Sequence, residues 1–179
     1  MIALFLGILF LYHIQASSSK KNKGDYPDAN EVMKNLPQTF MLQSLGNYTG
    51  LICGYQHFYN ETLRGQTYRK YDLLFKYPTT FFSQPLYVKD VTKNKIYMGS
   101  RPETYFPPDR ELDILFSDMQ SCMVSRKPAK QNSKACNLMV TKTSFDKPPE
   151  LCLQKFKEYC QGQAFNYTIT GCPYPEKLK

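Results

Sequence analysis

Hydrophobic and polar residues alternate through the middle of this chain, from residue 38 to about residue 125. The clearest case is Thr67–Tyr77, where Tyr71, Leu73, Phe75 and Tyr77 fall on one side and Lys70, Asp72 and Lys76 fall on the other. Comparable segments are rich in Tyr, Phe, Ile, Thr and Val and are separated by Asn, Gly and Pro, which is typical of strands and turns. They are Gln38–Leu45, Leu51–Tyr59, Leu86–Val91, Lys95–Met98, Glu111–Met119 and Ala135–Thr143.

Strands at this spacing predict a mainly β fold, built as an antiparallel barrel or sandwich. The segment Asn60–Gly65 suits a hairpin loop, and Gln163–Thr170 is a candidate for a last strand. One helix is expected before the strands in the sequence, and a second one after them. The first follows Asp28, a good N-cap with Glu31 three residues later, and stops at Pro37. The second begins at Pro148-Pro149-Glu150 and carries the apolar stripe Leu153, Phe156 and Tyr159.

The N-terminus has the pattern of a secretory signal peptide. Ile2–Tyr12 is an apolar run of 11 residues, whereas a membrane span needs about 20. A small residue, Ala16, and a polar stretch follow this run. We therefore expect a signal peptide over residues 1–16, a flexible polar arm over 17–27 and a single domain over 28–179, secreted to the extracellular space and without a membrane span. The alternative for residues 1–16 is an uncleaved membrane anchor.

Two further features agree with export. The first is a set of three glycosylation triplets, which begin at Asn47, Asn60 and Asn166. The second is an even number of cysteines, with no CxxC pair and no Cys/His cluster, so we expect three disulfides rather than a zinc site. Spacing alone leaves their pairing open.

Several classes of chemistry are excluded or disfavoured. His57 is the only histidine after the signal peptide, which excludes a two-histidine ribonuclease site and a multi-imidazole metal site. We find no P-loop, GxGxxG, EF-hand loop or GxSxG, so we expect no enzyme, no metal and no cofactor. The net charge of +8 comes from scattered residues, so nucleic acid is not expected, although glycosaminoglycan binding stays an alternative.

The composition feature that bears most on function is a surplus of aromatic residues, with 14 Tyr and 12 Phe. The inward side chains of a small barrel either fill it or line a pocket for one small ligand. Tyrosine suits a pocket lining, because it offers an apolar face and a hydroxyl group. Our candidates for ligand contact are Tyr55, His57, Tyr71, Leu73, Phe75, Leu115, Phe116 and Asp118. The alternative for each of them is a structural role, which for the apolar ones means plain core packing.

Residues 113–160 read DILFSDMQSCMVSRKPAKQNSKACNLMVTKTSFDKPPELCLQKFKEYC, and residues 28–36 read DANEVMKNL. These segments resemble the tick salivary lipocalins of the histamine-binding-protein family, in the SD-x-x-x-C strand end, the C-x-x-x-F-x-x-x-C helix and the N-terminal helix. The resemblance implies an eight-stranded antiparallel barrel with a C-terminal helix packed against it. It also implies the disulfides Cys53–Cys172 and Cys122–Cys152, which leaves Cys136 for Cys160. Members sequester host lipids or amines and so blunt inflammation and immunity.

Departures from the family pattern bear on the ligand. In amine-binding members an Asp follows the cysteine that corresponds to Cys122, and this chain has Met123 at that position. These members also use Trp, which this chain lacks. A buried ammonium group needs a carboxylate partner. Asp113 or Asp118 could substitute, so an amine such as histamine or serotonin stays an alternative. We favour a sterol, a fatty acid or an eicosanoid. The three triplets and the lost amine motif are similar to the japanin-like branch of immunomodulators. We also expect a monomer, and an immune-cell receptor or a plasma protein of the host is a further candidate partner.

Overall fold

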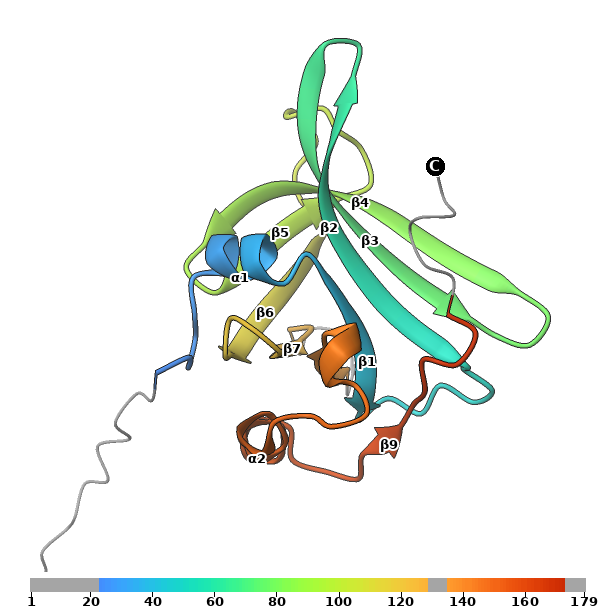
Figure 1. Cartoon of the computed structure of the whole chain (residues 1–179). Coiled ribbons are helices and arrows are strands. Elements are labelled where there is room, and N and C mark those ends of the chain that lie inside the picture. Colours follow the sequence, from blue (N-terminus) through green and yellow to red (C-terminus); the bar gives the residue numbers. More distant parts are fainter. Residues whose placement is uncertain (1–22, 129–134, 173–179) are drawn as a thin grey trace, which may run out of the picture.

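Strand β1 closes the sheet, because it pairs with β8 on one side and with β2 on the other. The computed structural model describes residues 23–128 and 135–172, and in them eight antiparallel strands form a closed barrel (Figure 1). A short strand β9 adds to the end of β1. The strands are β1 (Gln38–Ser44), β2 (Cys53–Leu63), β3 (Gln66–Lys76), β4 (Phe81–Thr92), β5 (Lys95–Gly99), β6 (Arg110–Ser117), β7 (Cys122–Arg126), β8 (Cys136–Val140) and β9 (Phe165–Asn166).

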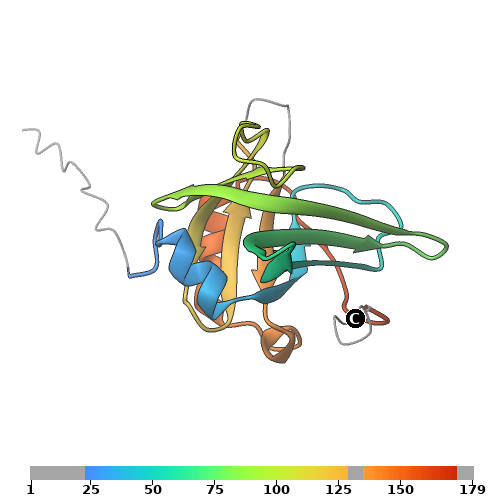
Figure 2. The ribbon, with the colours of Figure 1, turned by 90° about the horizontal axis from the view of Figure 1, so that it is seen from above.

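Helix α1 (Ala29–Asn35) covers one end of the barrel. The Asp28 side chain caps it by accepting the backbone N–H of Asn30 at 2.9 Å. Its buried residues Ala29 and Val32, with Leu36 just after it, pack against the side chains that fill the barrel. In Figure 2 the β3–β4 hairpin projects from the barrel on the side away from α1.

Helix α2 (Glu150–Tyr159) packs on the outside of the barrel, against β6, β7 and β8. The barrel wall therefore has apolar side chains on both faces. The interior cluster includes Met41, Phe58, Tyr71, Leu73, Leu86, Ile96, Met98, Leu112, Ile114, Met123 and Met139. The outer cluster lies between the wall and α2 with the segments beside it, and includes Phe40, Tyr55, Leu74, Leu115, Phe116, Val124, Leu138 and Phe156.

The predicted mainly β fold, the eight-stranded barrel and both helices are confirmed. The predicted loop at Asn60–Gly65 is wrong, because β2 and β3 continue to Leu63 and Gln66 and turn only at Arg64-Gly65. Both turn residues have positive φ, 50° and 78°, as the two-residue turns that follow strand twist require.

Two stretches of strand were not predicted. Strand β7 lies between the predicted strands that contain β6 and β8. Strand β4 begins at Phe81, five residues before the predicted start, and includes Pro85. Proline is tolerated there because Pro85 pairs only with Asp72 of β3, while β5 joins β4 from Tyr87 onward.

Three disulfides tie the C-terminal part of the chain to the barrel. They join Cys53 to Cys172, Cys122 to Cys152 and Cys136 to Cys160, the pairs that the family resemblance implied. The last two hold the two ends of α2 against β7 and β8, and the first holds Cys172 at the start of β2.

The described part of the predicted arm is packed rather than free. Asp25 forms a β-bridge with Phe116, and Tyr26 N–H donates to the Leu115 carbonyl at 2.9 Å. Lys155 of α2 completes this contact, with its Nζ 2.9 Å from Asp25 Oδ1 and 2.9 Å from Glu158 Oε2. The predicted signal peptide and residues 17–22 lie outside the described residues. Within residues 23–128 and 135–172, no helix has the length and hydrophobicity needed to cross a membrane.

Candidate functional site

A cavity of about 450 Å³ opens at the end of the barrel opposite α1. Its walls come from β3, β4, β5 and β6 and from the residues that follow β7. Tyr71 lies opposite Leu86 and Leu73 lies opposite Gln84 in the β3–β4 ladder, so these four residues share the inner face. The lining residues are Tyr71, Leu73, Gln84, Leu86, Tyr97, Met98, Pro108, Asp109, Arg110, Glu111, Leu112, Lys127 and Pro128.

A hydrogen-bonded polar group lies among the apolar side chains inside the barrel. Tyr71 donates its hydroxyl proton to Gln56 Oε1 at 3.1 Å, and Gln56 Nε2 donates to Thr39 Oγ1 at 2.9 Å and contacts Met123 Sδ at 3.4 Å. Burial, and then the neighbouring Tyr48, raise the pKa of Tyr71 far above its ordinary value. Tyr71 therefore stays protonated, and its oxygen can still accept one hydrogen bond from a ligand.

The mouth of the cavity carries charges of both signs. Glu111 and Asp113 both bind Lys95, which is 2.7 Å from Asp113 Oδ1. Hydrogen bonds to Asp113 and Glu111 outweigh desolvation and raise the pKa of Lys95. The pKa of Lys127 is lowered, first by partial desolvation and then by the charge of Arg110.

A smaller hollow of about 260 Å³ lies between α1 and the β2–β3 hairpin. Asn30, Met33 and Lys34 of α1 face Phe58 and Tyr59 of β2 across it. Its volume is below the usual range for small-molecule sites, which begins near about 300 Å³. The larger cavity is therefore the better candidate for a ligand site.

Among the predicted contact residues, Tyr71 and Leu73 line the cavity. Phe75 continues the same face toward the surface, where its ring stacks on Tyr48 with centroids 5.5 Å apart and lies 6.3 Å from Phe82. These three residues follow the alternation of β3, which placed them on one side of the strand.

The structure places the other predicted contact residues away from the cavity, and it does not test whether they contact a ligand elsewhere. Tyr55, Leu115 and Phe116 belong to the outer cluster. Tyr55 follows the alternation of β2, which directs Gln56 and Phe58 inward. A register shift between Ile114 and Phe116 accompanies the outward position of both Leu115 and Phe116.

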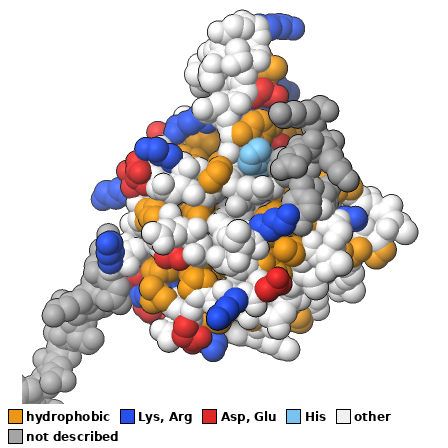
Figure 3. Space-filling view, viewed as in Figure 1, with side chains coloured by type: hydrophobic (Ala, Val, Ile, Leu, Met, Phe, Trp, Pro, Cys, Tyr) orange, Lys and Arg blue, Asp and Glu red, His pale blue; other side chains and the backbone are white. Residues whose placement is uncertain are grey.

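His57 also lies on the outer wall, because it alternates along β2 with the inward Gln56 and Phe58. Its ring stacks on Tyr59 with centroids 4.8 Å apart, and Tyr59 donates its hydroxyl proton to Asp72 at 2.9 Å. Burial lowers the pKa of His57, partly offset by the charge of Asp72. On this face of the molecule, basic and acidic side chains are interspersed (Figure 3).

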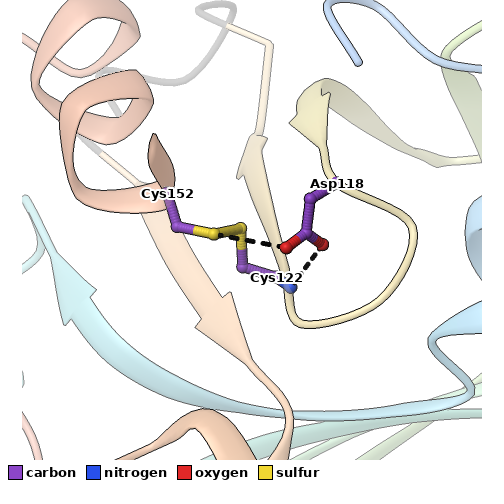
Figure 4. A group of neighbouring side chains, drawn as sticks. All are labelled: Asp118, Cys122 and Cys152. Carbon is purple, nitrogen blue, oxygen red and sulfur yellow. Dashed lines mark hydrogen bonds between the residues drawn. A yellow bond between two sulfur atoms is a disulfide. The ribbon is translucent and has the colours of Figure 1, made fainter. Parts of the chain in front are cut away.

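Asp118 organises the turn between β6 and β7 (Figure 4). Its Oδ1 accepts the backbone N–H groups of Gln120, Ser121 and Cys122 at 2.9, 2.7 and 2.9 Å. Its Oδ2 lies 3.7 Å from the sulfur of Cys152. This trio of Asp118, Cys122 and Cys152 has the spacing of a metal site, but its two sulfurs are already joined in a disulfide and offer no thiolate.

The sequence prediction missed most of the cavity lining. Gln84 and Leu86 lie on the inner face of β4, whose first half was not predicted. Gln56 lies on the inner face of a predicted strand, next to the outward Tyr55. Arg110 and Lys127 lie at the ends of β6 and β7, and only strand register brings these two ends to one mouth. A count of alternate positions along the predicted strands could have found Leu86, Met98 and Leu112.

Comparison with known proteins agrees with this architecture. Residues 53–172 match the family described as tick histamine binding protein. A comparison with curated proteins found no match. The similar solved structures include the serotonin complex of AM182, with a TM-score of 0.60 and 20% identity, covering 85% of this chain and 96% of that one. They also include the major allergen Per a 4 from cockroaches, with a TM-score of 0.58 and 12% identity, covering 82% of this chain and 94% of that one.

Japanin from Rhipicephalus appendiculatus bound to cholesterol is a more distant match, with a TM-score of 0.46 and 16% identity, covering 73% of this chain and 90% of that chain. The two closer likenesses support the barrel fold, while the family match extends from the start of β2 to Cys172 and so includes most of the barrel and α2. Because this match spans more than half of the residues, the chain belongs to the tick histamine-binding protein family.

Proposed function

We propose that this protein is secreted and that it binds and sequesters a small hydrophobic molecule, of the sterol, fatty acid or eicosanoid class. The observation that carries the proposal is the apolar lower part of the cavity, formed by Leu73, Leu86, Met98 and Leu112. A volume of about 450 Å³ is within the range of small-molecule sites. Burying hydrocarbon against these walls stabilises a complex by about 25 cal/mol per Å² of apolar surface removed from water.

A biogenic amine is the second candidate, and the likeness to the AM182 serotonin complex favours it. The position that holds an Asp in amine-binding members is Met123 here, and Met123 is fully buried inside the barrel. The two proposed substitutes do not reach the cavity, because Asp113 binds Lys95 and Asp118 binds the β6–β7 turn. In the described residues, the acids that line the cavity are Asp109 and Glu111 at its mouth, so the lower part has no carboxylate to pair with an ammonium group.

The biological role that we propose is control of a host mediator outside the cell. Three disulfides fit an oxidising compartment. The glycan acceptors that we propose, Asn47, Asn60 and Asn166, are all exposed. Removal of a lipid mediator at the feeding site would lower its free concentration and blunt the host response. Contact with an immune-cell receptor or a plasma protein stays a separate proposal, and so does the monomeric state.

Native mass spectrometry of protein secreted by eukaryotic cells tests the main proposal. We expect a bound lipid in about one-to-one ratio, or stoichiometric uptake of cholesterol or a fatty acid by delipidated protein. An empty cavity with no uptake of either would refute the proposal. Calorimetry with serotonin and histamine tests the second candidate, which would gain support from dissociation constants well below about 1 mM. The same mass spectra report the number of glycans and disulfides.

A further inference from the structure

Two cationic residues lie on the inner side of the mouth of the cavity. Arg110 begins β6 and shares its inner face with Leu112, opposite Met98 of β5. Lys127 directly follows β7, and its N–H still donates to the Ala135 carbonyl at 3.2 Å, so the alternation that turns Met123 inward reaches it. Both side chains line the cavity, on two neighbouring strands.

Neither cation is neutralised within the described residues. Of the two acids at the mouth, Glu111 is bound to Lys95, and Asp109 forms no ion pair with a described residue. Lys127 also faces the like charge of Arg110, which contributes to its lowered pKa. Two neighbouring cations that form no ion pair with a described residue repel each other, and an anion placed between them would remove that repulsion.

The charge is confined to the mouth. The rest of the lining includes Leu73, Leu86, Met98 and Leu112, which offer no group to an anion but a good surface to hydrocarbon. Tyr71, which lies opposite Leu86 on β4, is a polar group that already donates its proton to Gln56. A molecule that matches this order of surfaces has an anionic head and an apolar body.

We propose that Arg110 and Lys127 form an anion subsite that selects lipids with a single carboxylate head, such as long-chain fatty acids and their oxygenated derivatives. The head lies between the two cations, and the chain extends down the apolar walls toward Tyr71. This inference rests on the proposed function, and it goes further by setting the class of the lipid and its orientation. A planar guanidinium and a flexible ammonium can each donate to one carboxylate.

The test compares arachidonic acid, its methyl ester and cholesterol on delipidated full-length protein, by displacement of a fluorescent lipid. All three probes have an apolar body, but only arachidonic acid has a charged head. We expect the acid to bind at least tenfold more tightly than the ester. In the double variant Arg110→Gln/Lys127→Met, the acid should lose this advantage while the ester keeps its affinity. Added salt should weaken binding of the acid alone.

Arg126→Gln is the matched control, because Arg126 is an exposed cation beside Lys127 and its position directs it to the other face of the wall. It should leave all three affinities unchanged. Equal binding of acid and ester, or an acid preference that survives the double variant, would overturn the anion subsite and leave the proposed lipid binding in place. Failure of all three probes to bind would refute both.

Discussion

Replacing Lys155 with Met removes the ammonium group that Asp25 contacts between α2 and β6. The side chains of Lys155 and Asp25 are only 4% and 5% exposed, and their ion pair measures 2.9 Å. Loss of one partner of a buried ion pair costs about 3–5 kcal/mol, because the remaining group stays buried without its opposite charge. In a domain of this size, about 1 kcal/mol lowers the melting temperature by about 2–4 °C, so we expect a loss of about 6–20 °C.

The pH dependence of this contribution has a definite sign. Desolvation acts to lower the pKa of Lys155, but the hydrogen bonds that Lys155 donates to Asp25 and Glu158 outweigh it and raise the pKa above its ordinary value of 10.5. A lysine whose pKa is raised by folding stabilises the protein fully below the unfolded value and loses this effect as the pH rises through the folded value. The wild type should therefore lose stability above about pH 10, and the Lys155→Met variant should lose less there.

Urea titration and calorimetry at neutral pH measure the main effect. Lys157→Met is the control, because Lys157 lies on the same helix, is exposed and forms no ion pair with a described residue. The double variant Asp25→Asn/Lys155→Met should recover part of the loss, because it no longer buries a carboxylate that has lost its ammonium partner. A Lys155→Met protein within about 1 kcal/mol of the wild type would refute the reasoning.

Three further predictions concern the cavity and the wall. Leu86→Trp fills the cavity and should reduce lipid uptake at least tenfold in the displacement assay, whereas Leu151→Trp on the exposed side of α2 should not change it. Met123→Asp should cost several kcal/mol in urea titration, because it buries a carboxylate, and should raise serotonin affinity in calorimetry. His57 has a pKa lowered by folding, so wild-type stability should fall as the pH drops below about 6.5, and His57→Gln should flatten that part of the curve.

The sequence was a good guide to the fold because most strands alternate and are bounded by turn residues. Alternation could say which residues share a face, as it did for Tyr71, Leu73 and Phe75. It could not say which face is the inside, because α2 and the segments beside it give this barrel an apolar outer layer as well. Tyr55 and Tyr71 therefore looked equally suited to a ligand, although only Tyr71 lines the cavity.

The mouth of the cavity was harder to predict for a different reason. Arg110 and Lys127 are separated by a strand, a turn and a second strand, and neither belongs to a local motif. They meet at one opening because the pairing of β6 with β7 has a bulge between Ile114 and Phe116, which sets how far each strand extends. Such register is decided by packing of the whole barrel rather than by nearby residues.

Since α1 covers the far end of the barrel, the described residues leave the ligand one opening, at the mouth of the cavity. An incoming molecule must wait until the previous one has departed, so exchange should follow first-order kinetics with a rate that does not depend on the concentration of the competitor. The residence time of the ligand is then set by the side chains at the mouth of the cavity. A protein with these kinetics would keep its ligand bound long after the free concentration of that ligand has fallen.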